Sequence, residues 1–129
     1  MRQVWICAVA LLGVLAIAAA AAAAPTDQIS INVPVHVSQK TIYDVTINGF
    51  SRKRAIAYLF MDYTGCARTF AAEHKRAPKE ADYYSVHGTF TEVSGWKSSS
   101  SGSDHACAYL IGRTSGKLLA KARVSFVVR

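Results

Sequence analysis

The sequence predicts an all-β protein: a two-sheet β-sandwich of about seven strands that follows a helical export signal. Segments in which apolar and polar residues alternate dominate the chain after residue 25, and turn signals separate them at intervals of about 10 residues. No segment keeps a 3.6-residue periodicity for longer than about two turns. An open barrel is the alternative arrangement that the same strand pattern allows.

The first 24 residues have the pattern of a secretory signal peptide. Arg2 gives the amino terminus an extra positive charge, an apolar run covers 4–17, and alanines fill 18–24. A basic start, an apolar centre and small residues at the end are the features that signal peptidase recognises. We therefore expect cleavage after Ala24 and one exported domain over 25–129. An uncleaved membrane anchor is the alternative, because about 20 uncharged residues can span a bilayer.

The first half of the exported domain contains three predicted strands. Residues 29–37 alternate between apolar and polar side chains, and a proline within them indicates an edge strand. Residues 42–49 alternate in the same way and stop at an Asn-Gly turn signal. A polar loop over 51–54 follows. Residues 54–62 are then almost continuously apolar, as in a central strand that is covered on both faces.

The second half contains four more predicted elements. Residues 67–75 are assigned as a strand in this scheme, with one or two turns of helix as the alternative. Residues 83–92 are rich in β-branched and aromatic side chains, which favour a strand. A flexible, serine-rich connection over 94–103 leads to a strand at 104–112. After a glycine-containing turn, a strand at 118–128 ends the chain.

The exported domain contains two cysteines, Cys66 and Cys107. In an oxidising compartment two cysteines allow only one pairing, and closing a loop of about 42 residues stabilises a fold by about 4 kcal/mol. With the strands in up-and-down order, both cysteines fall at the same end of the sandwich. We therefore expect a structural disulfide, since neither CxxC spacing nor a neighbouring base marks a reactive thiol pair.

The order of these elements resembles a known family. The relevant segments are Val45–Gly49, Ala57–Cys66, His87–Phe90 and Cys107–Leu110. Together they make the chain over 29–128 similar to the immunoglobulin-like domains found singly in many exported bacterial proteins, mostly of unassigned function. The resemblance implies an immunoglobulin-like sandwich. It bears on architecture alone, because folds of this kind host many functions.

The chain departs from antibody-type domains of this fold at several positions. No tryptophan occurs within 54–62, and the first cysteine follows this strand instead of lying in the strand at 42–49. His105 stands where a tyrosine often sits, two residues before the second cysteine. The resemblance therefore does not imply the antibody-type tyrosine corner or central disulfide.

The positive charge of the domain indicates an anionic partner. Loss of Arg2 with the signal lowers the formal net charge from +7 to +6, and an exported protein of this sign is attracted to polyanions. In the strand scheme three basic loops lie at one end, where sandwiches often bind ligands. We expect an anion-binding tip there. Its residues are Arg52, Lys53, Arg54, Lys75, Arg76, Lys79, Arg113 and Lys117.

The sequence contains no catalytic or metal-binding motif. His36, His74, His87 and His105 lack the spacings of metal sites, and no GxSxG elbow or P-loop occurs. Glu73, His74 and Arg76 are the residue types of small basic nucleases. On a strand, however, Glu73 and His74 would point to opposite faces, away from a common substrate. We therefore expect no metal, no cofactor and no enzymatic activity.

These observations together predict a secreted or envelope-associated, noncatalytic binding module. Its expected partner is an anionic polymer of the cell envelope or another extracellular protein. Export excludes cytoplasmic nucleic acid, and contact with the membrane would come only through an uncleaved signal. A small secreted hydrolase or nuclease and a secreted protease inhibitor are the alternatives. Trp96, in the serine-rich connection, is either a partner anchor or a cap folded back on the sandwich.

Overall fold

The computed structural model describes residues 23–76 and 81–129. The predicted export signal therefore lies almost wholly outside the described residues, and Lys79 lies outside them too. The elements in chain order are β1 (Gln28–Asn32), β2 (Ile42–Met61), α1 (Phe70–Arg76), β3 (Ala81–Lys97), β4 (Gly102–Gly112) and β5 (Leu118–Val128). Within the described part of the chain, no helix has the length and apolar character needed to cross a bilayer.

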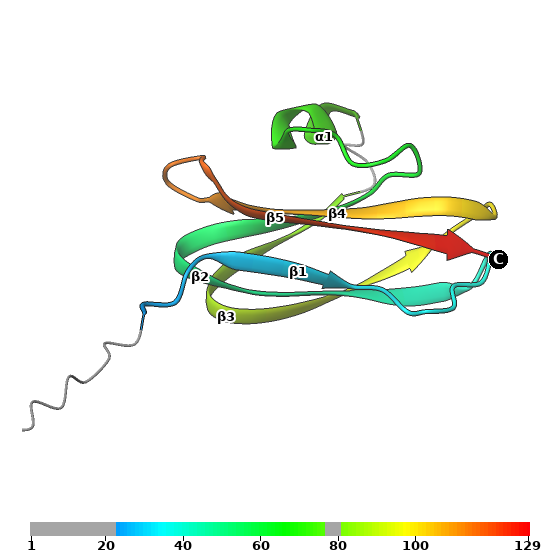
Figure 1. Ribbon diagram of the computed structural model, residues 1–129, viewed down its shortest axis with the longest axis horizontal. Helices are drawn as coiled ribbons and strands as arrows, with labels where there is room; N and C mark the ends of the chain where they lie inside the picture. The colour runs from blue at the N-terminus through cyan, green and yellow to red at the C-terminus, as the bar shows by residue number, and fades with distance from the viewer. Residues whose placement is uncertain (1–22, 77–80) are drawn as a thin grey trace, which may run out of the picture.

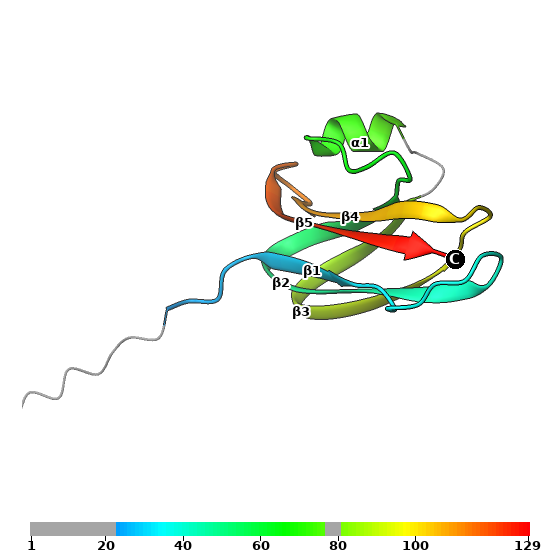
Figure 2. The same ribbon diagram turned by 45° about the vertical axis from the view of Figure 1, so that its right-hand side comes forward.

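The strands form two layers that share the long strands β2 and β3 (Figure 1). The first half of β2 pairs with β1 and β3, and its second half pairs with β3 and β4. β5 pairs with β4, and every one of these pairings is antiparallel. A parallel bridge between Val37 and Val128 joins the segment after β1 to the end of β5. Figure 2 shows β4 and β5 lying over β1 and the lower part of β2 and β3. The layers of the predicted sandwich are thus present, but they come from one continuous hydrogen-bonded sheet that folds over itself, and the two separate sheets that were expected are not what the described strands form.

A bulge in β2 forms the corner between the two layers. The strands predicted separately at 42–49 and 54–62 are halves of one 20-residue strand. Residues 52–54 lie opposite the single residue His87 of β3, so the extra residues are absorbed without ending the ladder. Gly88 adopts a φ of 69° beside this bulge, a conformation that glycine tolerates best. The corner explains why a polar triplet interrupts the alternation but does not form a loop.

The predicted strand over 67–75 is wrong, because the structure has the short helix α1 there. The Thr69 hydroxyl accepts the Ala72 N–H at 3.2 Å and so caps the first turn. The alanines, glutamate, lysine and arginine of this segment are strong helix formers. In Figure 1 the helix lies over the outer face of the β4–β5 layer. Over the described residues the fold therefore has five strands, four of them long, in place of the seven expected.

Two separate hydrophobic clusters support the two faces of the upper layer. The larger cluster lies between the layers and contains Val45, Ile47, Leu59 and Leu110, all fully buried. A smaller outer cluster, formed by Phe60, Cys107, Tyr109 and Ile111, lies under α1. The second half of β2 is thus covered on both faces, as its continuous apolar sequence predicted.

The region predicted as a flexible serine-rich connection is mostly ordered strand. β3 continues to Lys97 and β4 begins at Gly102, so only 98–101 connect the two strands. Trp96 pairs with Tyr43 of β2 and packs against the inner cluster. Trp96 therefore acts as a cap on the sandwich, which was one of the two expected roles.

Candidate functional site

The segment between β2 and the end of α1 is tied together by one carboxylate. Asp62, whose side chain is 5% exposed, accepts the Thr64 N–H at 2.9 Å and the Thr64 hydroxyl at 2.5 Å through Oδ1. Arg76, at the end of the helix, donates from Nε to Asp62 Oδ2 at 2.9 Å and from Nη2 to the Gly65 carbonyl. These bonds join the two ends of the 62–76 segment, which passes over β4.

A second carboxyl group projects from the buried side of α1. Glu73 is fully buried, and its Oε1 accepts the Ala67 N–H at 3.1 Å. Its Oε2 has no hydrogen-bond partner among the described residues, and Arg76 Nη2, 3.7 Å away, is too distant to supply one. A Glu73 carboxylate oxygen and the sulfurs of Cys66 and Cys107 all lie within 4.8 Å of one another. The carboxyl group is therefore packed against the cysteine pair.

The two carboxyl groups titrate in opposite directions. Burial raises the pKa of Glu73, and the neighbouring Asp62 raises it further because its negative charge disfavours a second one nearby. Burial opposes the ionisation of Asp62, but the hydrogen bonds from Thr64 and Arg76, together with the neighbouring Glu73, outweigh it and hold its pKa at about 2. The pair therefore keeps its proton on Glu73 and its negative charge on Asp62.

These opposite shifts predict two separate pH dependences of stability. Ionised Asp62 stabilises the fold above pH 3.8, and this contribution of about 2 kcal/mol is lost as the pH falls from 3.8 to about 2. Glu73 acts in the other sense: above pH 4.5 the unfolded chain releases a proton that the folded protein retains, so stability decreases as the pH rises.

Urea denaturation between pH 2 and pH 8 measures both effects. Asp62→Asn is expected to remove the loss of stability at low pH. Glu73→Gln, which resembles the protonated side chain, is expected to flatten the decline above pH 4.5. If the stability of Glu73→Gln falls with pH above 4.5 as steeply as that of the unaltered protein, the assignment of the proton to Glu73 is contradicted.

Cys66 and Cys107 form the expected disulfide, with sulfurs 1.98 Å apart and Cα atoms 5.7 Å apart. The bond joins the segment before α1 to the middle of β4. It lies on the outer face of the sandwich, because Cys107 belongs to the outer cluster. Cys107 is fully buried, whereas Cys66 is partly exposed. The two cysteine residues therefore differ in their exposure to solvent.

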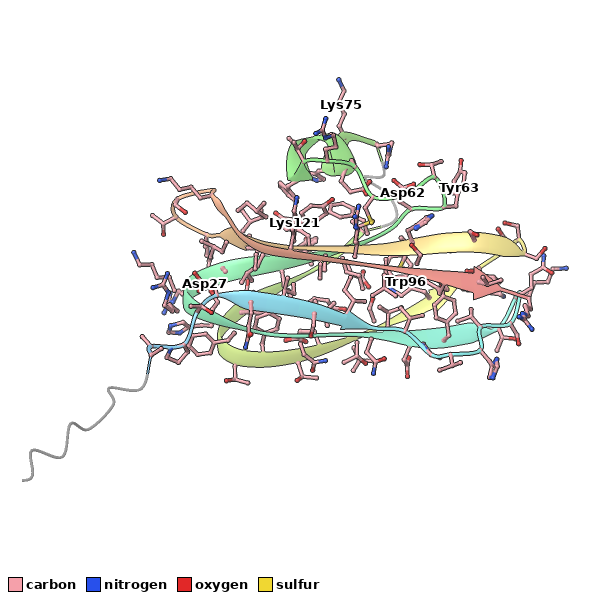
Figure 3. All side chains as sticks on the ribbon, viewed as in Figure 1. Asp27, Asp62, Tyr63, Lys75, Trp96 and Lys121 are labelled. Atoms are coloured by element: carbon pink, nitrogen blue, oxygen red, sulfur yellow. A yellow bond between two sulfur atoms is a disulfide. The ribbon has the colours of Figure 1, made fainter. Side chains whose placement is uncertain are left out.

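A groove of about 450 Å³ opens beside this disulfide, and we call it the cationic groove. Its lining residues are Cys66, Ala67, Arg68, Tyr109, Lys121, Ala122 and Arg123. Lys121 and Arg123 lie two residues apart on β5, opposite Tyr109 and Cys107 of β4. Figure 3 shows Lys121 on the side of β5 that faces α1. Arg68 contributes a third positive charge from the segment before the helix.

The three cations of the cationic groove are available to a ligand. All three side chains are exposed, and none forms an ion pair with any acidic group in the described part of the chain. The Tyr109 hydroxyl, which borders the groove, donates to the Ala67 carbonyl at 3.3 Å. This bond positions the wall of the groove next to Cys66.

The structure describes seven of the eight cations of the predicted tip, all but Lys79, and it does not bring these seven together. Five of them meet at the corner of β2 and the β4–β5 turn, where the Arg113 N–H donates to the Arg54 carbonyl at 3.0 Å. Arg52 in this group pairs with Asp27 through its guanidinium at 3.5 Å. Lys75 points away from the sheet on the far side of α1 (Figure 3). Arg76 is held by Asp62.

Three groove residues escaped sequence reasoning. Lys121 and Arg123 alternate along the last strand, and this alternation is the signal that places them on one exposed face. Arg68 belongs to the segment that was assigned as strand, so its position over β5 was hidden. The four histidines do not join a ligand cluster within residues 23–76 and 81–129, where the one such group is Cys66, Glu73 and Cys107.

Comparison with known proteins supports the fold. No protein-family model and no curated protein matches this chain. Among solved structures, it is similar to the CARDB domain of the PF1109 protein from Pyrococcus furiosus, determined in complex with di-metal ions. The TM-score is 0.51 at 10% sequence identity, over 81% of this chain and 89% of that one. This likeness supports the β-sandwich fold and bears on the fold alone.

Proposed function

We propose that this chain is an exported, noncatalytic binding module whose cationic groove binds an anionic polymer of the cell envelope. One observation carries the proposal: Arg68, Lys121 and Arg123 converge on one groove from two separate segments, and no acidic side chain of the described residues pairs with them. Unpaired cations gathered in a concave surface raise the local concentration of anions. The sandwich fold and the predicted export signal are consistent with this role.

The spacing of the cations suits a repeating anionic chain. Lys121 and Arg123 lie two positions apart along an extended strand, which places their Cα atoms about 7 Å apart. An extended polymer with a phosphate, sulfate or carboxylate at each repeat presents charges at comparable intervals. Arg123 and Arg68 can each bind such a group through two N–H donors, which adds geometric selectivity to the charge.

The positions of the acidic residues favour binding over hydrolysis. A nuclease would need an accessible acid or base next to the phosphate. Glu73 is sealed beneath α1, and Asp62 is occupied by Thr64 and Arg76. The disulfide tethers a helix at this position instead of the extended loop that a protease inhibitor would present. These features support a noncatalytic module.

Charge removal tests the groove directly. The triple variant Arg68→Ser, Lys121→Ser, Arg123→Ser is expected to elute from heparin and from an immobilised polyphosphate at clearly lower salt. Each lost phosphate contact lowers the slope of log affinity against log salt by about 0.7 to 0.9, so the slope should fall by about 2. Circular dichroism checks that the variant remains folded.

Two control variants make the result specific to the groove. Lys75→Ser, Lys97→Ser, Arg129→Ser removes the same charge from exposed positions elsewhere, and a much smaller loss is expected. Arg54→Ser, Arg113→Ser, Lys117→Ser removes three of the four cations of the corner that form no ion pair with the described residues. Equal losses in the groove variant and the exposed-position variant would show attraction to net charge alone. A larger loss in the corner variant would place the binding surface there.

A further inference from the structure

We propose that the Cys66–Cys107 disulfide is exchanged by small anionic thiols, with Glu73 as the proton donor to the released Cys107. This activity goes beyond the proposed function and shares only the cationic groove with it. Three arrangements in the structure support it. They are the unequal access to the two sulfurs, the cations beside the accessible one, and the buried carboxyl group against both.

The access to the two sulfurs determines which one is attacked. Cys66 lines the cationic groove and is partly exposed, whereas Cys107 is fully buried beneath α1. A thiol in solution therefore reaches Cys66, and the Cys107 sulfur is the leaving group. An exchange of this kind gives a mixed disulfide on Cys66 and a free thiol on Cys107.

The cations of the groove select the attacking thiol. The thiolate is the nucleophile in disulfide exchange, and nearby positive charge favours the thiolate over the thiol. Arg68, Lys121 and Arg123 supply that charge around Cys66 and also attract carboxylates on the same small molecule. A tripeptide thiol with two carboxylates, such as glutathione, has this chemistry, and an uncharged thiol does not.

Glu73 is placed to protonate the sulfur of Cys107 when it leaves. A thiolate released at the buried Cys107 would be a charge in an apolar cluster, which is costly unless it is neutralised. The Glu73 carboxyl group is fully buried, lies against both sulfurs, and has an Oε2 without a hydrogen-bond partner in the described structure. Its pKa is raised by burial, which favours the protonated form of this carboxyl group. The resulting carboxylate would then face Arg76, whose Nη2 is 3.7 Å away.

The step balances in bonds, electrons and protons. The incoming thiolate forms a bond to Cys66 Sγ as the Cys66–Cys107 bond breaks, and the bonding pair leaves with the Cys107 sulfur. The proton moves from Glu73 to that sulfur, so the incoming sulfur is oxidised and Cys107 is reduced. A second thiolate attacks the mixed disulfide, which releases the Cys66 thiolate and a disulfide of the two small molecules.

The native fold can accommodate this reaction without global unfolding. The Asp62–Arg76 pair joins the two ends of the 62–76 segment independently of the disulfide. Phe70 of α1 packs against Phe60 and Tyr109 of the sheet. These contacts hold the helix over β4 while the sulfur bond is open.

The experiment is the rate of reduction of the folded protein by glutathione and by 2-mercaptoethanol, followed by mass spectrometry after acid quenching. We expect the ratio of the glutathione rate to the 2-mercaptoethanol rate to be higher for the folded protein than for the urea-unfolded protein. We also expect the glutathione adduct to form on Cys66. Glu73→Gln is expected to slow the reaction of the folded protein by about 100-fold, the lower range of general acid catalysis. The matched control Glu92→Gln should leave the rate unchanged.

Each contrary outcome overturns the proposal. Reduction only at the rate of global unfolding would show a purely structural disulfide, and an adduct on Cys107 would reverse the assigned attack. An unchanged rate in Glu73→Gln would remove the proton donor. If that variant does not fold, the proposal is tested by the thiol preference and the position of the adduct in the unaltered protein. Retention of Glu73→Gln on heparin tests polyanion binding separately, and it should match that of the unaltered protein.

Discussion

Replacement of both Cys66 and Cys107 by alanine is expected to lower the free energy of unfolding by about 4 kcal/mol. The crosslink spans 41 residues of sequence, so its removal restores much conformational freedom to the unfolded chain. Cys107 is fully buried in the outer cluster, and the smaller alanine adds a packing loss. Denaturation by urea measures the difference, and the dependence on urea should steepen because the unfolded state expands.

The reduced, unaltered protein is the matched control for this double variant. It loses the same crosslink but keeps both side chains, so its stability should lie slightly above that of the double variant. Both should remain folded, since a domain of this size usually has a margin of 5–15 kcal/mol. A loss below about 1 kcal/mol in both samples would contradict the entropic role of the crosslink.

Phe60→Ala is expected to cost about 4 kcal/mol, in the range found for large aromatic side chains removed from a core. Phe60 is fully buried, and its ring lies 5.9 Å from that of Tyr109 and 6.1 Å from that of Phe70, measured between centroids. Thermal and urea denaturation measure the loss.

Two further substitutions interpret the Phe60 result. Phe60→Leu keeps most of the volume and should cost less than about 1.5 kcal/mol. Ile42→Ala removes a side chain that is 70% exposed and should change the stability by no more than about 0.5 kcal/mol. A cost for Phe60→Ala close to that of Ile42→Ala would mean that the outer cluster contributes little to the fold.

The strands were predictable where one physical pattern acts alone. Alternation marks 118–128, whose outward residues face solvent, and a continuous apolar run marks the half of β2 covered by both clusters. The pattern failed at 52–54, because three consecutive charged residues are as typical of a loop as of an exposed bulge. No local signal distinguishes the two, since the continuity of β2 depends on its pairing with β3.

The candidate site was less predictable than the fold. The pairing of the cysteines followed from their number, but the position of Glu73 against them depends on α1 being a helix. On a strand Glu73 would have been one more polar residue in a charged segment. The groove likewise exists only because the helix and the residues before it cover part of β5. Its cations come from parts of the sequence more than 50 residues apart, which no local motif records.

The separation of the inner and outer clusters has a consequence for the dynamics of the molecule. Proteins open locally in units whose stability can be far below that of the whole domain. The outer cluster is small, and the 62–76 segment reaches the sheet chiefly through it, the disulfide and the hydrogen bond from Tyr109 to Ala67. We therefore expect this segment to open as a cooperative unit of its own. A ligand that binds only when the segment is packed on the sheet would stabilise the packed form against local opening. The sandwich beneath the segment would keep the same structure in both forms.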